Sequence, residues 1–218
     1  RDRRADRTGP LMRAVVMAGG QGTRLKPYTT VLPKPLLPVG DRPVLAILLE
    51  HLAAAGVTQV DLCLGHLGEL IRAYLADARL ALDGLRVALH TEPEPMGTAG
   101  ALRDLPDLDE PFLVLNGDVL TAIDPAAVMA AHRAGGAQLT ITTQLRETTI
   151  GAGVLELDGD TVTGYTEKPV LRHVVSLGVY CLHPVALEVL PPGRVDIPAL
   201  ATALVADGRP VRQHRYDG

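Results

Sequence analysis

The sequence predicts an α/β fold in which helices cover a mostly parallel sheet, and three observations carry this prediction. From Arg13 onward, short runs rich in β-branched residues alternate with longer stretches of helical periodicity. The 218 residues are 47% hydrophobic and 21% charged, which is the composition of one globular domain. Aromatic residues make up only 3% of the chain, so its core must be built from Leu, Val, Ile and Ala.

The elements of the first two thirds follow from this alternation. Five strands are predicted, at Ala14–Met17, Val57–Leu64, Leu85–His90, Phe112–Asn116 and Gln138–Thr142. Four helices are predicted between them, at Pro43–Ala55, Gly68–Leu75, Thr98–Leu105 and Pro125–Ala134. Pro43 and Pro125 suit a first helical turn, because the missing N–H of proline costs nothing there.

After Gly151 the alternation of strand and helix patterns stops. Val154–Leu157 and Val162–Tyr165 flank the turn residues Asp158-Gly159-Asp160, which predicts a β-hairpin. The remaining elements are a strand over Val174–Leu182, a helix over Pro198–Ala206 and a strand over Pro210–His214. Residues 1–11, which include four arginines, precede the first apolar run and are predicted to be a disordered linker or an expression remnant.

Charge and hydropathy exclude several classes of protein. The formal charge of -4 argues against a general affinity for nucleic acid or for acidic membranes. The apolar runs are far shorter than the roughly 18 residues of a membrane span. Cys63 and Cys181 lie in apolar segments without metal-binding spacing, so we expect buried free thiols. The N-terminal residues contain no apolar stretch typical of a signal peptide, which predicts a cytoplasmic protein.

The connection after the first strand has the composition of a phosphate-binding loop. Residues 19–41 contain four Gly and four Pro, a length and composition that indicate function. Glycines directly after a strand let backbone N–H groups approach an anion, and Arg24 adds a charged fork for phosphate oxygens. The dinucleotide fingerprint GxGxxG fails at Leu25, and the Walker loop finds no Lys-Ser or Lys-Thr pair. A third kind of phosphate loop is therefore predicted.

Two charged side chains are candidates for the same site. Lys34 lies between two prolines that stiffen the backbone and aim a single cation, although a solvated lysine would fit the same pattern. Asp118 follows the strand Phe112–Asn116 at its carboxyl end, where ligands bind in open parallel sheets. A carboxylate facing phosphates is best explained by Mg²⁺, while a turn-stabilising role is the alternative.

Two further segments carry weaker signals. Thr98 precedes a predicted helix and could be its N-cap, and Gly97 and Gly100 would allow a flat ligand to approach closely. Glu167 and Lys168 follow the hairpin beside a proline, where an exposed ion pair of no functional meaning is the alternative.

Taken together and in this order, these motifs resemble the sugar-1-phosphate nucleotidyltransferase family. The matching segments are Gly19–Leu25, Pro33–Pro35, Gly97–Gly100, Asn116–Asp118 and Glu167–Pro169. The resemblance implies a Rossmann-like three-layer α/β/α sandwich with a small β-hairpin lobe that binds the sugar. The segment Glu92–Leu102 looks most like the mannose-1-phosphate guanylyltransferase branch. Relatives continue after a segment like Tyr216–Gly218 with a motif that holds a second metal-binding Asp, so residues 12–218 are expected to be a single domain that lacks its C-terminal end.

The resemblance also implies roles for individual residues. The nucleotide would be bound by Ala18, Gly19, Gly20, Gly22, Thr23, Arg24, Gly97 and Thr98. The sugar phosphate would be bound by Gly153, Glu167, Lys168 and Ser176, the last standing where many relatives have Asn. Catalysis would rest on Arg24, Lys34, Asp118 and Lys168, with Asp118 binding Mg²⁺ as the cofactor.

The function implied is conversion of a nucleoside triphosphate and a sugar 1-phosphate to a nucleotide sugar and pyrophosphate. GTP with mannose 1-phosphate, or a related sugar phosphate, is the leading pair, and homo-oligomers are frequent in the family. Thymidylyl and uridylyl transfer are alternatives within the family. A catalytically silent subunit that binds a nucleotide sugar and regulates an active partner is an alternative of another class. A third alternative, an NAD-dependent oxidoreductase, is disfavoured because Leu25 stands where the dinucleotide fingerprint requires glycine.

Overall fold

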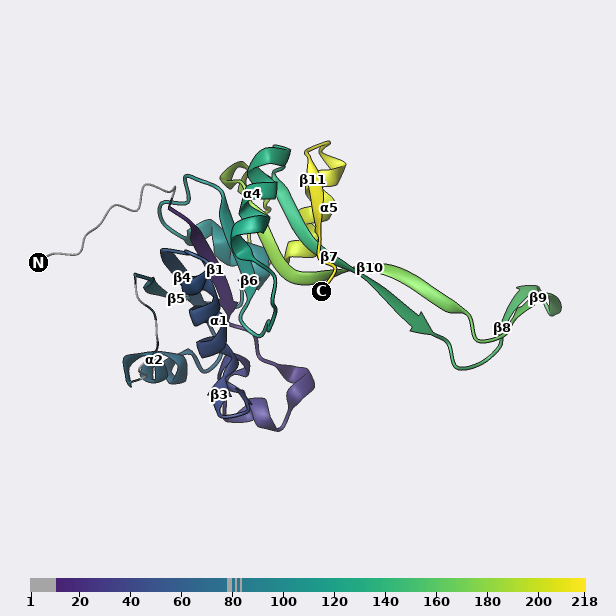
Figure 1. Ribbon diagram of the computed structural model, residues 1–218, viewed down its shortest axis with the longest axis horizontal. Helices are drawn as coiled ribbons and strands as arrows, with labels where there is room; N and C mark the ends of the chain where they lie inside the picture. The colour runs from purple at the N-terminus through teal and green to yellow at the C-terminus, as the bar shows by residue number, and fades with distance from the viewer. Residues whose placement is uncertain (1–10, 78–79, 81, 83) are drawn as a thin grey trace, which may run out of the picture.

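A seven-stranded sheet with helices packed on both faces forms the body of the molecule (Figure 1). The computed structural model describes residues 11–77, 80, 82 and 84–218. In order across the sheet, the strands are β11 (Val211–Arg215), β7 (Leu139–Thr149), β10 (Val170–Leu182), β6 (Phe112–Asn116), β1 (Arg13–Ala18), β4 (Gln59–Leu64) and β5 (Arg86–Thr91). In the described sheet β10 alone runs antiparallel to its neighbours, so the predicted mostly parallel sheet is confirmed.

Alternation of side chains along the strands builds two separate cores. One face of the sheet carries α1 (Val44–Ala54), α2 (Gly68–Asp77) and α4 (Pro125–Gly135), and the other carries α3 (Gly97–Gly100) and α5 (Ile197–Ala206). Val16 of β1 packs in the first core and its neighbour Val15 in the second, because successive side chains of a strand point to opposite faces. The three-layer α/β/α sandwich is therefore confirmed.

The helices begin at residues that differ slightly from the predictions. Pro125 is the first residue of α4, as predicted, and the Asp124 carboxylate accepts a hydrogen bond from the backbone at that end. Pro43 instead has an extended backbone in the short strand β3 (Arg42–Pro43), which pairs with β2 (Pro38–Val39). Tertiary pairing of this proline thus overrides its preference for a first helical turn.

The predicted helix Thr98–Leu105 also differs. It begins at Gly97 as the single turn α3 and continues as the 3₁₀ helix Ala101–Asp104. The connection over residues 19–41 contains three further 3₁₀ helices, Thr23–Leu25, Tyr28–Thr30 and Lys34–Leu36. This segment lies at one end of the body (Figure 1).

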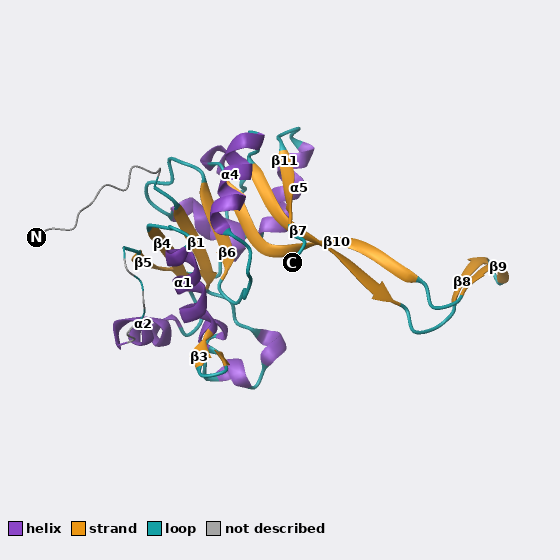
Figure 2. Ribbon diagram, in the orientation of Figure 1, coloured by secondary structure: helices purple, strands orange, loops and turns teal. Residues whose placement is uncertain are grey.

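The two longest strands leave the body as a two-stranded ribbon (Figure 2). β7 and β10 pair from Leu139 and Leu182 out to Thr149 and Val170, with a break in register between Ser176 and Tyr180. The far end of the ribbon carries the predicted hairpin, formed by β8 (Val154–Asp158) and β9 (Thr161–Thr166). We call residues 143–176, which comprise the outer ribbon and the hairpin, the arm.

The sequence predicted strands over Gln138–Thr142 and Val174–Leu182, so it missed the outer half of β7 and the first four residues of β10. The outer ribbon mixes polar and apolar residues on both of its faces, and every residue over Leu145–Thr149 and Val170–Val174 is exposed. Because neither face is buried, the ribbon has no burial pattern that a sequence could reveal.

Both cysteines are buried and free, as predicted. Burial raises the pKa of the Cys63 and Cys181 thiols to about 12. Within the described part of the chain, we find no helix with both the length and the apolar character needed to span a membrane. Of residues 1–11, predicted as a linker or expression remnant, residues 1–10 lie outside the described residues.

Candidate active site

A cavity of about 860 Å³ lies at the carboxyl ends of β1, β5 and β6. Its walls come from Met17–Leu25, Lys34–Pro35, Gly65–His66, Glu92–Pro95, Gly97–Thr98, Asn116, Asp118, Arg194 and Asp196. The structure therefore brings together every residue predicted to bind the nucleotide, along with Lys34 and Asp118. We call it the nucleotide cavity. Its place is the one expected for ligands of open parallel sheets.

Gly22 gives the loop after β1 its sharp turn. Its φ of 59° lies in the left-handed region, and the Thr29 hydroxyl donates a hydrogen bond to the Gly22 carbonyl over 2.8 Å. A Cβ added at Gly22 would lie 2.7 Å from the Thr29 methyl group. At Gly20, by contrast, an added Cβ would meet nothing within 4 Å. The loop backbone is thus tied down on one side and open to a ligand on the other.

Gly19 allows the start of this loop to pack against two neighbours. An added Cβ would lie 2.9 Å from Glu92 Oε1 and 3.2 Å from the Gly65 backbone nitrogen. The half-buried Glu92 carboxylate also accepts a 3.0 Å hydrogen bond from the Met96 N–H. Burial raises the pKa of Glu92 above its usual value. A carboxylate acceptor therefore stands in the wall of the nucleotide cavity.

Lys34 and Asp118 form an ion pair across the nucleotide cavity. Lys34 begins the 3₁₀ helix Lys34–Leu36 with a proline on either side, while Asp118 follows β6. The Gly117 N–H donates to the Met17 carbonyl over 2.9 Å, which fixes the Asp118 backbone against β1. Both side chains are partly exposed, so both are accessible to a ligand in the cavity.

The structure corrects the prediction that Thr98 caps its own helix. Thr98 lies inside α3, and its hydroxyl accepts a 2.9 Å hydrogen bond from the Ile197 N–H at the start of α5. The Thr98 N–H donates to Asp196 Oδ1 over 3.0 Å. These bonds join α3 to α5, so Thr98 shapes the cavity wall through a distant helix.

The two glycines of this motif are explained by packing against the chain. An added Cβ at Gly97 would lie 2.5 Å from the Val195 carbonyl oxygen, and one at Gly100 would lie 2.9 Å from the Gly193 carbonyl oxygen. The segment before α5 therefore packs closely against Gly97 and Gly100. It occupies the space in which the sequence predicts a flat ligand. Gly97 and Thr98 nevertheless line the nucleotide cavity.

A second cavity of about 640 Å³ adjoins the first. Asn116 and Asp118 line both cavities, and Ser176, Gln144 and Arg146 line only the second. We call it the arm-base cavity, because its lining includes the residues where the ribbon leaves the body. Asp118 therefore stands at the junction of two spaces large enough for separate substrates.

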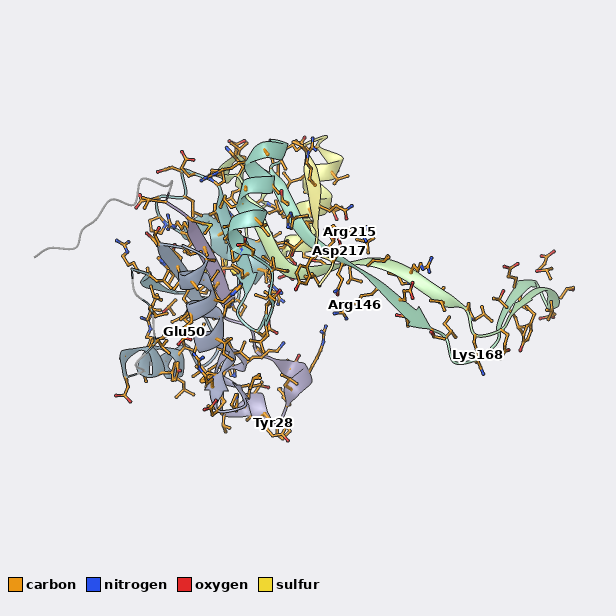
Figure 3. All side chains as sticks on the ribbon, viewed as in Figure 1. Tyr28, Glu50, Arg146, Lys168, Arg215 and Asp217 are labelled. Atoms are coloured by element: carbon orange, nitrogen blue, oxygen red, sulfur yellow. The ribbon has the colours of Figure 1, made fainter. Side chains whose placement is uncertain are left out.

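The other residues predicted to bind the sugar phosphate lie away from both cavities. Glu167 and Lys168 are exposed on the arm, and Figure 3 shows Lys168 well beyond Arg146, which lies where the ribbon leaves the body. Tyr165 donates a 3.0 Å hydrogen bond to Glu167, and a Cβ added at Gly153 would collide with the Tyr165 hydroxyl. The structure thus gathers Gly153, Glu167 and Lys168 with one another and separates them from Asp118.

Sequence reasoning missed several residues of the two cavities. Glu92 and Asp196 lie in loops where a carboxylate ordinarily signals nothing more than solvent exposure. Arg146 lies in a ribbon whose existence the sequence did not reveal. Of these residues, Glu92 alone could have been identified by position, because it directly follows a parallel strand, at the edge where ligands bind.

The donor set of the nucleotide cavity fits Mg²⁺ if the substrates supply further ligands. Among the described residues there is no cluster of three or more His, Cys, Asp or Glu side chains placed to hold a metal ion. Mg²⁺ is usually held by one or two carboxylates together with substrate phosphates and water. Asp118 provides one such carboxylate, which faces the cavity that holds the phosphate-type loop.

Comparisons with known proteins agree with this geometry. A family model described as "Nucleotidyl transferase" matches residues 13–203. Mannose-1-phosphate guanylyltransferase 1 of Arabidopsis thaliana is 34% identical over 81% of this chain and 51% of its own length. The UTP–glucose-1-phosphate uridylyltransferase of Synechocystis sp. is 31% identical over 84% of this chain and 52% of its own. The chain therefore spans about half the length of the curated relatives it matches.

The fold is found among solved structures as well. The crystal structure of HddC from Yersinia pseudotuberculosis shares 25% identity and a TM-score of 0.70, covering 94% of this chain and 90% of HddC. A glucose-1-phosphate thymidylyltransferase structure from Bacillus anthracis, at 20% identity and a TM-score of 0.70, has the same fold. Nucleotidyltransferases of this family generally use a divalent metal ion. From its motifs, its fold and these relatives, the chain belongs to the nucleotidyl transferase family.

Proposed function

We propose that the protein transfers a nucleotidyl group from a nucleoside triphosphate to a sugar 1-phosphate. One observation carries the proposal: a single cavity unites the glycine loop, Arg24, Lys34 and Asp118, and it meets a second cavity at Asp118. A transfer between two bound phosphates requires two adjoining spaces with positive charge near their junction, and this arrangement supplies both.

The reaction needs alignment and charge neutralisation more than proton transfer. An oxygen of the sugar phosphate attacks the α-phosphorus of the nucleotide and forms a new P–O bond. The bond from the α-phosphorus to the bridging oxygen of the β-phosphate breaks, and pyrophosphate leaves with the electron pair. The attacking oxygen is already ionised at neutral pH, so no general base is required. Positioning and electrostatic stabilisation therefore account for the catalysis.

The glycine loop and three charged residues of the nucleotide cavity have roles in this scheme. Backbone N–H groups of Gly20–Thr23 bind the triphosphate, and Arg24 stabilises the departing pyrophosphate. Lys34 leaves Asp118 and neutralises the reacting phosphates. Mg²⁺ bound at Asp118 would further neutralise the phosphate oxygens. The metal ion would thus replace Lys34 as the partner of Asp118, and both cations would neutralise phosphate charge.

We propose GTP as the nucleotide substrate and mannose 1-phosphate, or a related sugar phosphate, as the second substrate. Several relatives are named as mannose-1-phosphate guanylyltransferases. Glu92 supports the same choice, because guanine presents two N–H donors on one edge to a carboxylate acceptor, whereas uracil and thymine present one. We therefore expect Glu92→Gln to lower the preference for GTP over UTP.

The proposal is tested by pyrophosphate release with Mg²⁺ across a grid of nucleoside triphosphates and sugar 1-phosphates. We expect turnover with GTP and a mannose-type phosphate, and a loss of about 10²-fold or more in Arg24→Ala. Arg86→Ala is the matched control, because Arg86 is exposed at the opposite end of β5. Turnover in Arg24→Ala equal to that of the Arg86→Ala control would refute these roles.

A silent regulatory subunit is the second candidate function. The separation of Lys168 from Asp118 favours it, because a binding protein does not need the two to meet. Calorimetry distinguishes the two functions: a silent subunit binds the nucleotide sugar but releases no pyrophosphate with any pair in the grid.

A further inference from the structure

We propose that Arg194 recognises the base of the bound nucleotide, with its guanidinium group donating hydrogen bonds to the O6 and N7 atoms of guanine. The inference rests on the proposed function, because it requires a nucleoside triphosphate in the nucleotide cavity. It adds a specificity-determining residue from the segment before α5, far along the chain from the glycine loop.

The segment that carries Arg194 is fixed against α3 by hydrogen bonds at both of its ends. We call residues 191–196 the wall segment. The Val195 N–H donates to the Met96 carbonyl over 2.9 Å, and the Val195 carbonyl accepts from two N–H groups of α3, each over 2.9 Å. The Pro191 carbonyl accepts from a side chain of the 3₁₀ helix that follows α3. Because this backbone is already ordered, binding a ligand through Arg194 costs little further conformational entropy.

Met96 joins the wall segment to Glu92. Its N–H donates to the Glu92 carboxylate over 3.0 Å, and its carbonyl accepts from Val195, the residue directly after Arg194. Arg194 and Glu92 both line the nucleotide cavity. Glu92 is half-buried, whereas Arg194 is exposed. A carboxylate acceptor and a guanidinium donor therefore stand in the same wall of the cavity, connected through one residue.

The charges around Arg194 favour a neutral ligand over a phosphate. Glu92, Glu94 and Asp196 line this wall with Arg194, whereas the other Lys and Arg side chains of the cavity belong to residues 19–41. Among the described residues, Arg194 forms no ion pair with these carboxylates. A triphosphate beside three carboxylates would be repelled, so it binds at the loop. Arg194 then faces an uncharged part of the nucleotide that carries hydrogen-bond acceptors.

Guanine is the base that matches a carboxylate and a guanidinium group in one wall. Its N1 and N2 donors suit Glu92, and its adjoining O6 and N7 acceptors suit the two-pronged donor of Arg194. Adenine carries an amino donor in place of O6, and the pyrimidines have no N7. The two side chains together therefore select guanine over the other three bases.

A nucleotide that lacks one acceptor atom tests this contact directly. In 7-deaza-GTP a C–H group replaces N7, and calorimetry without sugar phosphate compares its binding with that of GTP. We expect the wild-type chain to bind 7-deaza-GTP about tenfold more weakly than GTP, because a hydrogen bond from a charged donor is lost. Arg194→Met should bind both nucleotides equally. Arg86→Met is the matched control and should keep the tenfold difference, because Arg86 is exposed and lies outside the cavity lining.

A lysine variant separates base recognition from general attraction to the phosphates. Arg194→Lys keeps the charge but loses the two-pronged donor, so we expect it to lose most of the discrimination between GTP and 7-deaza-GTP. Equal binding of the two nucleotides by the wild-type chain overturns the proposal. It is also overturned if Arg194→Met weakens both nucleotides by the same factor and keeps their difference, since Arg194 would then act on the phosphates.

The same measurements distinguish failure of this inference from failure of the proposed function. Discrimination between GTP and 7-deaza-GTP through Arg194, without pyrophosphate release from any substrate pair, would refute nucleotidyl transfer alone. Pyrophosphate release from GTP, with equal binding of the two nucleotides, would overturn the role of Arg194 alone. A wild-type chain that binds no GTP would overturn both.

Discussion

The ammonium group of Lys34, in a 3₁₀ helix, contacts the carboxylate of Asp118, which follows β6. A carboxylate engaged by an ammonium group is a poorer metal ligand than a free one, because the cation competes for the same oxygens. Under the proposed function, metal binding at Asp118 and release of Lys34 would therefore be linked events. A lysine released in this way would be available to the substrate phosphates.

Replacing Lys34 should separate metal affinity from turnover. We expect Lys34→Met to bind Mn²⁺ a few-fold more tightly in the absence of nucleotide, measured by calorimetry, because the competing charge is gone. Turnover should fall by about 10²-fold, because the reacting phosphates lose a cation. Lys26→Met, a change in the same loop outside the cavity lining, should alter neither quantity. Weaker metal binding in Lys34→Met would contradict the linkage.

The two glycines of the phosphate loop should differ in their tolerance of a methyl group. Gly22→Ala places a side chain at a φ of 59° and against Thr29, so we expect a loss of about 1–3 kcal/mol in the free energy of unfolding. Gly20→Ala is the control, because its Cβ meets nothing, and its unfolding should stay within about 0.5 kcal/mol of wild type. Urea denaturation measures both. Equal losses would mean that Thr29 and the turn do not restrict Gly22.

Arg146 is expected to bind the sugar phosphate from the arm-base cavity. Arg146→Ala should raise the KM for sugar 1-phosphate about tenfold while the KM for the nucleotide stays unchanged, because its side chain lines only the second cavity. Arg172→Ala, on the same ribbon but paired with Glu147 over 2.7 Å, is the control. A parallel rise in both KM values would place Arg146 elsewhere in the mechanism.

Stability should fall in mild acid because of His132. Burial, with the nearby charges of His183 and Arg133, lowers the pKa of His132 from 6.5 to about 4. Below pH 6.5 the unfolded chain takes up a proton that the folded chain refuses, so stability is lost as the pH falls from 6.5 to about 4. The full effect is about 3 kcal/mol.

Urea unfolding across this pH range measures the effect. His132→Gln should remove most of this slope, and His173→Gln, at an exposed site, should retain it. An unchanged slope in His132→Gln would assign the acid sensitivity to other groups.

Most of the fold could be predicted because its central strands are buried on both faces. The strand Phe112–Asn116 is apolar up to Leu115, and its bounds in the structure match the prediction. The outer ribbon could not be predicted, since Leu145–Thr149 pairs only with Val170–Val174 and leaves both faces in solvent. Pro43 was misplaced because pairing with β2 decided its backbone.

The residues of the candidate site likewise fall into those that the sequence could predict and those that it could not. Residues that follow parallel strands, such as Gly19–Arg24 and Asp118, could be assigned to one cavity because strand ends meet at one edge of the sheet. The position of Lys168 could not be derived in this way, because it depends on the direction in which the arm leaves the sheet. Thr98 was assigned to its own helix because nothing in the sequence reveals contact with α5, nearly a hundred residues away.

The register break in β10 divides one strand into two parts of unequal local stability. From Tyr180 inward, its amides lie between β6 and β7 and should exchange with solvent deuterium only on global unfolding. From Ser176 outward, they have one partner strand and exposed flanks, so they should exchange through local opening many times faster. Gly178, with a φ of 74° at the break, lets the chain change direction there. The outer half can thus open and close again while the sheet stays intact.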